Sequence, residues 1–418
     1  MAHMSGGKGT LTDIGEALDM VLAETRPLEA EEVPLREAYG RTLATDVVAA
    51  DDIPPFVNSA MDGYALRGAD LAAGRRQFRL IDEVPAGRVS RLILGEGEAI
   101  KIMTGAPLPE GADTVAPIEV AEQEGATVSL RDTVAPSANV RLPGEDVRRG
   151  ETVFTRGQPL GPAEVGLLAS LGFARVAVAR RPRVAILATG DELIEVDEPL
   201  RPGKIRNSNS YSSYGQVLEA GGTPVPLGIA RDDLAETRRL LERALREDVV
   251  LTSGGVSVGE FDFVKVAQDE LGVQRRFWGV RSKPGKPVAF GVRDGKLVFG
   301  APGNPVAVMV AFELYIRPAL LAMQGRRDIY RPHVWAQAEE EVRRTRNRVE
   351  VRRCVLHQRD ERWFFTTTGP QGSGILRSMA LADGLVFVPP NFAGAGPGTR
   401  LMVMLLSGTS AERPPFPT

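Results

Sequence analysis

The sequence predicts a multidomain α/β protein organised around a central, doubly wound, mostly parallel sheet. At 418 residues the chain is too long for one ordinary core, so several domains are expected. Between residues 184 and 323, short apolar runs alternate with amphipathic segments, which is typical of an open parallel sheet with helices on both faces. Between residues 56 and 145, and again after residue 325, the pattern changes to short strands and turns.

The first part of the chain predicts a helical domain that is interrupted by a β domain. Residues 11–26 place apolar side chains at helical spacing and end before Pro27. Short apolar strands and turn residues follow, and a helical pattern returns at 161–171. We therefore predict a discontinuous N-terminal helical and linker domain at 8–50 and 147–180, with a β domain inserted at 51–146.

Two further domains are predicted after Arg181-Pro182-Arg183. The α/β domain, at 181–325, has predicted strands at 184–188, 223–230, 249–252 and 275–280, a hairpin at 288–299, and helices at 209–220, 234–246, 261–271 and 305–323. The last domain, at 326–418, is predicted to be a small β barrel or sandwich, because its strands alternate polar and apolar residues.

Composition excludes several classes of function. The net charge of −3 and the absence of a long basic run argue against nucleic acid as a partner. No apolar stretch approaches the roughly 20 residues that cross a bilayer. The single cysteine, Cys354, excludes an internal disulfide and favours a reducing cytoplasm. The three histidines lack ligand spacing, so any metal needs oxygen ligands rather than a zinc site.

One stretch, LTSGGVSVGEFD at 251–262, combines a strand end, a glycine-rich turn and a predicted helix start. Uncovered amides and a helix N-terminus favour an anion. No lysine follows the loop, so it is not a Walker A phosphate loop. Its two carboxylates, Glu260 and Asp262, suggest a divalent metal between protein and phosphate. A tight turn without a ligand is the alternative.

Polar residues also follow the other predicted strands. In an open α/β sheet, ligands bind beyond the carboxyl ends of the strands, so these residues are expected at one edge. Helix capping or solvated loops would explain some of them separately, but their convergence favours a site for oxyanions. They are Thr189, Gly190, Asp191 and Glu192; Arg231, Asp232 and Asp233; Ser253, Gly254 and Gly255; Lys283 to Pro287; and Pro302 to Pro305.

The predicted β domain carries three dense polar segments, at 55–65, 102–109 and 141–146. They contain Asp62, Thr104, Arg141 and Asp146 among glycines and prolines. From the residue types alone, structural turns and a functional surface are equally compatible with these segments.

Taken together, these motifs resemble one known family. NSAMDGYA, IMTGAPLP, RLPGED, TGDEL, TSGGVSVGEFD, KPGKP and GAPGNP occur in the order found in the molybdopterin molybdenumtransferases, which include the MoeA proteins and the C-terminal domain of gephyrin. The resemblance covers nearly the whole chain and implies a MogA-like central domain. It also implies insertion of molybdenum from molybdate into adenylylated molybdopterin, with release of AMP and with Mg²⁺ present.

The resemblance further implies a homodimer whose active sites lie between subunits. Asp62, Asp146, Asp262 and Lys283 are the implied catalytic residues, and Glu192, Asp232 and Asp262 the implied Mg²⁺ ligands. The implied substrate-binding residues are Thr104, Arg141, Thr189, Gly190, Ser253, Gly254, Gly255, Lys286, Pro302, Pro305, Ser373 and Ser378. The molybdopterin adenylyltransferase is a further candidate partner.

Some points stay open at this level. The family often has a lysine directly after the tryptophan of the fourth strand, where this chain has Gly279; Arg281 is a candidate replacement. Which of Ser373 and Ser378 contacts substrate is undecided, as is a preference for molybdate or tungstate. A molybdopterin-binding scaffold without catalysis and a molybdopterin adenylyltransferase are the alternative functions.

Overall fold

The computed structural model describes residues 11–85, 87–255 and 263–418. The chain forms two compact units. The first comprises the chain up to Ala44, Gly157–Gly161 and Val176–Thr418, and the second comprises Thr45–Arg156 and Pro162–Arg175. The four-domain division proposed from the sequence stays a prediction, because contacts separate only these two units.

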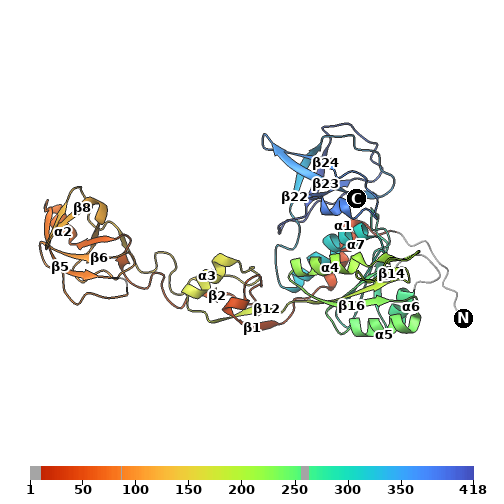
Figure 1. Ribbon diagram of the computed structural model, residues 1–418, viewed down its shortest axis with the longest axis horizontal. Helices are drawn as coiled ribbons and strands as arrows, with labels where there is room; N and C mark the ends of the chain where they lie inside the picture. The colour runs from red at the N-terminus through yellow and green to blue at the C-terminus, as the bar shows by residue number, and fades with distance from the viewer. Residues whose placement is uncertain (1–10, 86, 256–262) are drawn as a thin grey trace. The chain divides into compact units, whose positions relative to one another are not determined.

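A six-stranded sheet forms the centre of the first unit, in the order β16-β13-β17-β21-β20-β18. Its edge strand β16 is labelled in Figure 1. Four neighbours, β16, β13, β17 and β21, run parallel, whereas β20 is antiparallel to both β21 and β18. The predicted doubly wound, mostly parallel sheet is therefore confirmed. The strands are β13 (Arg183–Thr189), β16 (Thr223–Ala230), β17 (Val249–Ser253), β18 (Gln274–Trp278), β20 (Ala289–Arg293) and β21 (Lys296–Ala301).

Alternate residues of the parallel strands face two different helical layers. On β13, Val184 and Ile186 belong to one apolar cluster and Ala185 and Leu187 to another. The first cluster includes residues of α1 (Ile14–Glu24), α4 (Ser208–Glu219), α7 (Pro305–Ala311) and α8 (Arg317–Met323). The second includes residues of α5 (Leu234–Ala244) and α6 (Phe263–Glu270). A continuous apolar strand is thus buried on both faces, as its sequence predicts.

Helix α1 packs in the core of the sheet unit. Ile14, Ala17, Leu18 and Val21 are fully buried in the cluster that also contains the α8 residue Leu320. The periodicity of residues 11–26 correctly predicts the helix but carries no information on its partner. An amphipathic helix can bury its apolar face against any element.

The segment Pro305–Met323 corrects one expectation from the sequence. It is 19 residues long and apolar enough to cross a membrane by length and composition, contrary to the reading that no stretch approaches this limit. However, 89% of this window is buried inside the fold. It consists of α7, a π-helical turn at Phe312–Ile316 and α8, and serves as a core helix.

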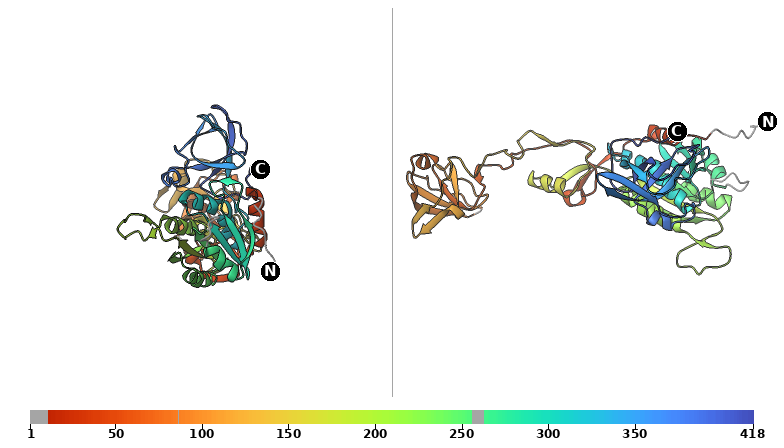
Figure 2. Two further views of the ribbon diagram at one scale, coloured as in Figure 1. Left: turned by 90° about the vertical axis from the view of Figure 1, so that its right-hand side faces the viewer. Right: turned by 90° about the horizontal axis from the view of Figure 1, so that it is seen from above.

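The C-terminal strands close into a five-stranded barrel, shown in blue in Figures 1 and 2. The ring runs β23-β24-β22-β26-β25 and returns to β23. The short strand β19 (Ser282–Lys283) pairs in parallel with β23 and so attaches a loop of the sheet to the barrel. The barrel elements are β22 (His333–Ala338), β23 (Val349–Arg359), β24 (Arg362–Thr367), α9 (Arg377–Ala380), β25 (Gly384–Val388) and β26 (Arg400–Leu405).

The second unit contains another six-stranded sheet, in the order β7-β4-β6-β5-β9-β8. Two short antiparallel strand pairs, β3 with β10 and β2 with β11, also belong to this unit. Its elements are β2 (Val47–Val48), β3 (Asn58–Ser59), β4 (Gly63–Leu66), α2 (Gly68–Ala72), β5 (Gln77–Val84), β6 (Glu98–Ile102), β7 (Thr114–Pro117), β8 (Ala121–Glu124), β9 (Thr127–Leu130), β10 (Val140–Arg141), β11 (Thr152–Phe154) and α3 (Pro162–Ser170). The strands β1 (Ala30–Pro34) and β12 (Arg175–Ala179) pair with each other.

Candidate functional site

Hydrogen bonds join the polar residues at the carboxyl ends of the parallel strands. The hydroxyl of Thr189 donates to the backbone carbonyl of Ser253 at 3.4 Å. The amide of Gly190 donates to Ala230 at 3.1 Å, and that of Gly254 donates to the last residue of β21 at 3.1 Å. Four of the predicted residues therefore lie at one edge of the sheet, as the strand-end rule requires.

The turn Pro302–Pro305 lies against this edge. A Cβ atom built on Gly303 would lie 4.0 Å from the Cα of Gly254. The side-chain amide of Asn209, in α4, donates to the carbonyl of Gly303 at 2.8 Å. The Oδ1 atom of Asn209 and the hydroxyl of Ser253 are buried and have no hydrogen-bond partner in the described part of the chain. Buried polar atoms without partners are uncommon, and at a strand-end edge they indicate a site for a ligand or for water.

A cavity of about 520 Å³ opens beside the turn. Three cations, Lys283, Lys286 and Arg348, line it together with the hydroxyl-bearing Ser373. No Asp or Glu is among the described residues of its lining. A wall of this composition is suited to a multiply charged oxyanion. The full lining is Ser282, Lys283, Pro284, Gly285, Lys286, Pro287, Pro302, Asn304, Ala307, Arg348, Gln371, Gly372 and Ser373.

Lys283 also forms an ion pair behind the cavity. Its ammonium lies 3.0 Å from Glu350, and Arg352 contacts the other carboxylate oxygen of Glu350 at 2.8 Å. Burial opposes ionisation of Glu350, but the hydrogen bonds from Arg352 and Lys283 outweigh it and lower the pKa of this carboxyl group. Glu350 therefore stays charged near neutral pH and fixes the direction of Lys283.

The described acids do not form a complete metal site. The carboxylate of Glu192 lies beside Gly190, where an added Cβ would meet it at 2.3 Å, and the amide of Asp232 donates to Asp191 at 3.2 Å. Carboxylate oxygens suit Mg²⁺. However, residues 11–85, 87–255 and 263–418 contain no group of three or more possible ligands. Asp262, the third predicted ligand, lies outside the described residues.

In the second unit, Asp62 and Thr104 form a pair. Oδ1 of Asp62 accepts hydrogen bonds from the backbone amide and from the hydroxyl of Thr104, each at 2.7 Å. These two donors, the amide first, lower the pKa of the Asp62 carboxyl group although it is fully exposed. The 55–65 and 102–109 segments therefore meet at this pair.

The 141–146 segment also meets the first of these segments. Arg141 lies opposite Asn58 in the pairing of β10 with β3, and Asn58 also bridges to Pro107. Asp146 is exposed, and its amide donates to the carbonyl of Ile53 at 2.9 Å. Asp62 and Thr104 thus lie on turns, and Arg141 on β10, in segments that contact one another. All four predicted residues of this group belong to the second unit, and their roles stay predictions.

The structure places the two predicted serines differently. Ser373 lines the cavity, whereas Ser378 is 2% exposed and accepts a hydrogen bond from Arg353 at 2.9 Å. Ser378 is thus a supporting residue rather than part of the cavity wall. Arg281, the candidate replacement for the missing lysine, forms an ion pair with Asp13 at 3.3 Å. Gly279 has a positive φ of 92°, and a Cβ there would lie 2.8 Å from Leu11, so a lysine would be strained at this position.

Reasoning from the sequence missed Arg348 and Gln371, which line the cavity. Both belong to the C-terminal domain. The pairing of Ser282 with Val349 brings Arg348 to the loop that carries Lys283. No local sequence pattern predicts a strand pairing between segments so far apart in the chain. The one available indication was that Arg348 directly precedes a predicted strand of alternating polar and apolar residues.

A doubly wound sheet with an attached barrel and a cationic cavity beside a strand-end turn defines an α/β protein with a site suited to an oxyanion. Three family models match the chain: the MoeA N-terminal region (domain I and II) at 12–172, the probable molybdopterin binding domain at 185–322 and the MoeA C-terminal region (domain IV) at 336–406. The chain belongs to the molybdopterin molybdenumtransferase (MoeA) family of enzymes, as its motifs predicted.

Similar proteins agree with this assignment. Molybdopterin molybdenumtransferase 2 of Mycobacterium tuberculosis is 38% identical over 384 residues, covering 89% of this chain and 94% of the relative. The molybdopterin molybdenumtransferase of Bacillus subtilis is 34% identical over 418 residues, covering 98% and 97%. The crystal structure of the molybdopterin biosynthesis moeA protein of Pyrococcus horikoshii OT3 matches with a TM-score of 0.79 at 33% identity, covering 95% of this chain and 100% of that one.

Proposed function

We propose that this chain transfers molybdenum from molybdate to adenylylated molybdopterin, releasing AMP, in the biosynthesis of the molybdenum cofactor. Its family membership and the names of its relatives support this function. Proposed residence in the cytoplasm follows from the single, buried cysteine, Cys354, which fits a reducing compartment.

The cavity beside the Pro302–Pro305 turn is the observation that carries the proposal. Molybdate is a tetrahedral dianion, and the cavity offers Lys283, Lys286 and Arg348 without a carboxylate in its described lining. Charge-assisted hydrogen bonds from such groups are stronger than neutral ones and hold an oxyanion in place. In this proposal Ser373 donates a further hydrogen bond, and the proline-framed turn gives the wall its rigid shape.

The strand-end loops bind the adenylyl phosphate in the same proposal. The amide of Gly255 and the buried, unpartnered hydroxyl of Ser253 face the phosphate in this proposal, and Thr189 and Gly254 form the edge around them. We further propose that Glu192, Asp232 and Asp262 hold Mg²⁺. Bound there, Mg²⁺ would supply positive charge against the phosphate oxygens.

Asp62, Thr104, Arg141 and Asp146 complete the proposed site from a partner subunit of a homodimer. Arg141 supplies an exposed cation, and Asp62, ionised through Thr104, supplies a fixed negative charge that orients the substrate. The resemblance to the family supports this arrangement. The molybdopterin adenylyltransferase remains a proposed partner that delivers the substrate.

The test is a defined assay with purified protein, adenylylated molybdopterin, molybdate and Mg²⁺. AMP release and molybdenum incorporation are expected to increase in parallel over time. Both are expected to require molybdate and to stop when EDTA removes Mg²⁺. Lys286→Ala is expected to lower kcat/KM for molybdate by about 10- to 100-fold, the effect of losing one charged contact. Arg239→Ala, on α5 with its side chain 62% exposed, is the control for loss of a cation away from the cavity.

Other outcomes identify the alternatives. Tight binding of molybdopterin without any turnover indicates a scaffold. Transfer of AMP from ATP to molybdopterin by this chain alone indicates an adenylyltransferase. Either result contradicts the proposed molybdenum transfer.

A further inference from the structure

Arg353 is the largest side chain that the described fold buries completely. It lies on β23 and is 0% exposed. Its guanidinium has no carboxylate partner among the residues that the structure describes; burial alone lowers its pKa to about 10. A buried cation without a counter-charge destabilises a fold unless its N–H groups are hydrogen-bonded. Its presence therefore needs a specific reason.

The side chain of Arg353 binds one loop, residues 368–378. Its Nε–H donates to the hydroxyl oxygen of Ser378 at 2.9 Å, and a terminal nitrogen donates to the carbonyl of Gly372 at 3.1 Å. The Ser378 hydroxyl in turn donates to the carbonyl of Ile375 at 2.6 Å. One guanidinium thus fixes both halves of the loop.

The main chain of Arg353 binds the same loop. Its amide donates to Oε1 of Gln371 at 2.8 Å, and its carbonyl accepts from Nε2 of Gln371 at 3.1 Å. The carbonyl also accepts from the amide of Thr368 at 3.0 Å. The loop is therefore wrapped around a single residue of the barrel.

This loop forms part of the cavity wall. Gln371, Gly372 and Ser373 line the cavity, whereas Arg353 does not. The carbonyl of Ser373 accepts from the amide of Val306, in the first turn of α7, at 3.1 Å. The loop therefore spans from Arg353 in the barrel to the Pro302–Pro305 turn of the sheet domain.

We propose that Arg353 is a positioning residue that acts through Ser378 and Gly372 to hold the loop carrying Ser373 in place, so that molybdate meets a preformed cavity wall. The inference rests on the proposed function for the identity of the ligand. Arginine suits this position because its planar guanidinium directs several N–H groups at fixed angles. Lysine keeps the charge but cannot reproduce this fork.

Two variants test the proposal in the full-length protein: Arg353→Lys, which keeps the charge, and Ser378→Ala, which removes the acceptor. Arg359→Lys is the matched control, since Arg359 lies on the same strand with its side chain 57% exposed. In both test variants we expect amide exchange of residues 368–378 to speed up about tenfold while the rest of β23 is unchanged. We expect KM for molybdate to rise about fivefold or more, with kcat within about twofold of the wild type.

Measuring amide exchange together with KM and kcat distinguishes positioning of the loop from general support of the fold. A fold defect lowers the active fraction, and hence kcat, without changing KM, which would overturn the proposal. A raised KM with unchanged loop exchange would mean that Arg353 acts on the ligand directly, and this also overturns it. In the double variant, the rise in KM is expected to match that of the more impaired single variant, because both changes break the same hydrogen-bonded connection from Arg353 to the loop. Fully additive effects on KM would contradict this connection.

The proposed function can be wrong while the role of Arg353 in holding the loop is still testable. If the wild-type protein neither binds nor uses molybdate, the assigned ligand is wrong. The amide exchange measurement then still shows whether Arg353 and Ser378 hold the loop, and unchanged exchange in both variants overturns the inference.

Discussion

At the scale of single residues, Gly254 leaves no room for a side chain. Its φ is +92°, and a Cβ there would lie 2.6 Å from the backbone oxygen and 2.7 Å from the hydroxyl of Thr189. We expect Gly254→Ala to destabilise the first unit by about 1–3 kcal/mol through backbone strain alone, with displacement of Thr189 in addition. The midpoint of urea unfolding and the kcat/KM for adenylylated molybdopterin measure the two effects.

Gly295 provides the control for this prediction. It also has a positive φ, +75°, but an added Cβ would meet nothing within 4 Å. Gly295→Ala therefore reports the backbone strain without the collision. Equal losses of stability in the two variants, with activity retained in both, would show that the contact with Thr189 is unimportant.

The Asp62–Thr104 pair gives a second prediction at this scale. The folded state lowers the pKa of Asp62 below its ordinary value of 3.8. The hydrogen bonds to ionised Asp62 therefore stabilise the folded state above that value, and this stabilisation is lost as the pH falls through the lowered pKa. Thr104→Val removes the hydroxyl donor but keeps the amide donor, so we expect the pKa of Asp62 to rise only part of the way to its ordinary value.

NMR titration of the Asp62 carboxyl carbon measures this change directly. Thr127→Val, at an exposed position of β9 in the same sheet, is the control and is expected to leave the titration unchanged. An unchanged pKa in Thr104→Val would mean that the amide alone accounts for the shift.

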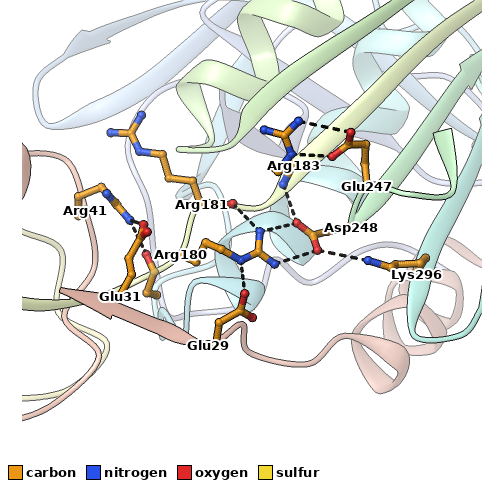
Figure 3. A network of polar contacts seen from close by, with 10 residues as sticks. Glu29, Glu31, Arg41, Arg180, Arg181, Arg183, Glu247, Asp248 and Lys296 are labelled. Carbon is orange, nitrogen blue, oxygen red and sulfur yellow. Dashed lines mark hydrogen bonds and ion pairs between the residues drawn. The ribbon is translucent and has the colours of Figure 1, made fainter. Parts of the chain in front are cut away.

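At the scale of elements, an ionic network ties the amino ends of the central strands to neighbouring segments (Figure 3). Asp248, 7% exposed, accepts two hydrogen bonds from Arg180 at 2.8 and 2.9 Å and one from the amide of Arg183 at 2.9 Å. Lys296 of β21 lies 3.6 Å away. These contacts join the starts of β13 and β21 to the segment before β17.

Removing the charge of Asp248 is expected to loosen this end of the sheet. Breaking a buried pair costs about 3–5 kcal/mol, and we expect about 2–3 kcal/mol for Asp248→Asn because the Arg180 side chain is 26% exposed. Urea unfolding at pH 7 measures the loss. Glu242→Gln, which breaks an exposed pair with Arg238 on α5, is expected to cost less than about 1 kcal/mol.

The pH dependence follows from the direction of the pKa shift. Burial opposes ionisation of Asp248, but hydrogen bonds from Arg180 and Arg183 outweigh it and lower its pKa below 3.8. Its contribution is therefore complete above the unfolded value and disappears as the pH falls through the lowered pKa. The stability difference between wild type and Asp248→Asn should shrink in this acidic range; a constant difference would assign the effect to packing.

The sheet illustrates what local sequence can predict. Apolar runs such as Val249–Ser253 and the polar residues after them predicted both the strands and the edge where Thr189, Ser253 and Gly254 meet, because strand direction fixes which ends converge. The antiparallel direction of β20 also follows from the short hairpin to β21.

Contacts between distant segments could not be predicted in this way. Arg353 reads as one more polar residue in an alternating strand, yet it is completely buried because a loop about 20 residues later wraps around it. Likewise, the amphipathic pattern of α1 does not reveal that its partner is the sheet cluster, and the charge of Arg281 does not reveal its pair with Asp13. Only tertiary packing selects these partners.

At the scale of the whole molecule, the proposed site divides its residues between the two compact units. Asp62 belongs to the second unit and Lys286 to the first. If each active site combines units from two subunits of a homodimer, Asp62→Ala and Lys286→Ala are each strongly impaired alone when molybdate is limiting. A heterodimer of the two then contains one intact site and one doubly altered site. Random exchange of equal amounts should restore about a quarter of wild-type activity, since about half of the dimers are mixed.

A matched mixture makes this test decisive. Asp62→Ala and Arg141→Ala alter the same unit, so every site in their mixed dimers keeps one alteration and activity should not return. Sedimentation analysis checks that exchange has produced dimers in both mixtures. Only a site shared between subunits can combine the unaltered Asp62 of one variant with the unaltered Lys286 of the other. If activity does not rise in the first mixture although mixed dimers form, each site is therefore built from one chain.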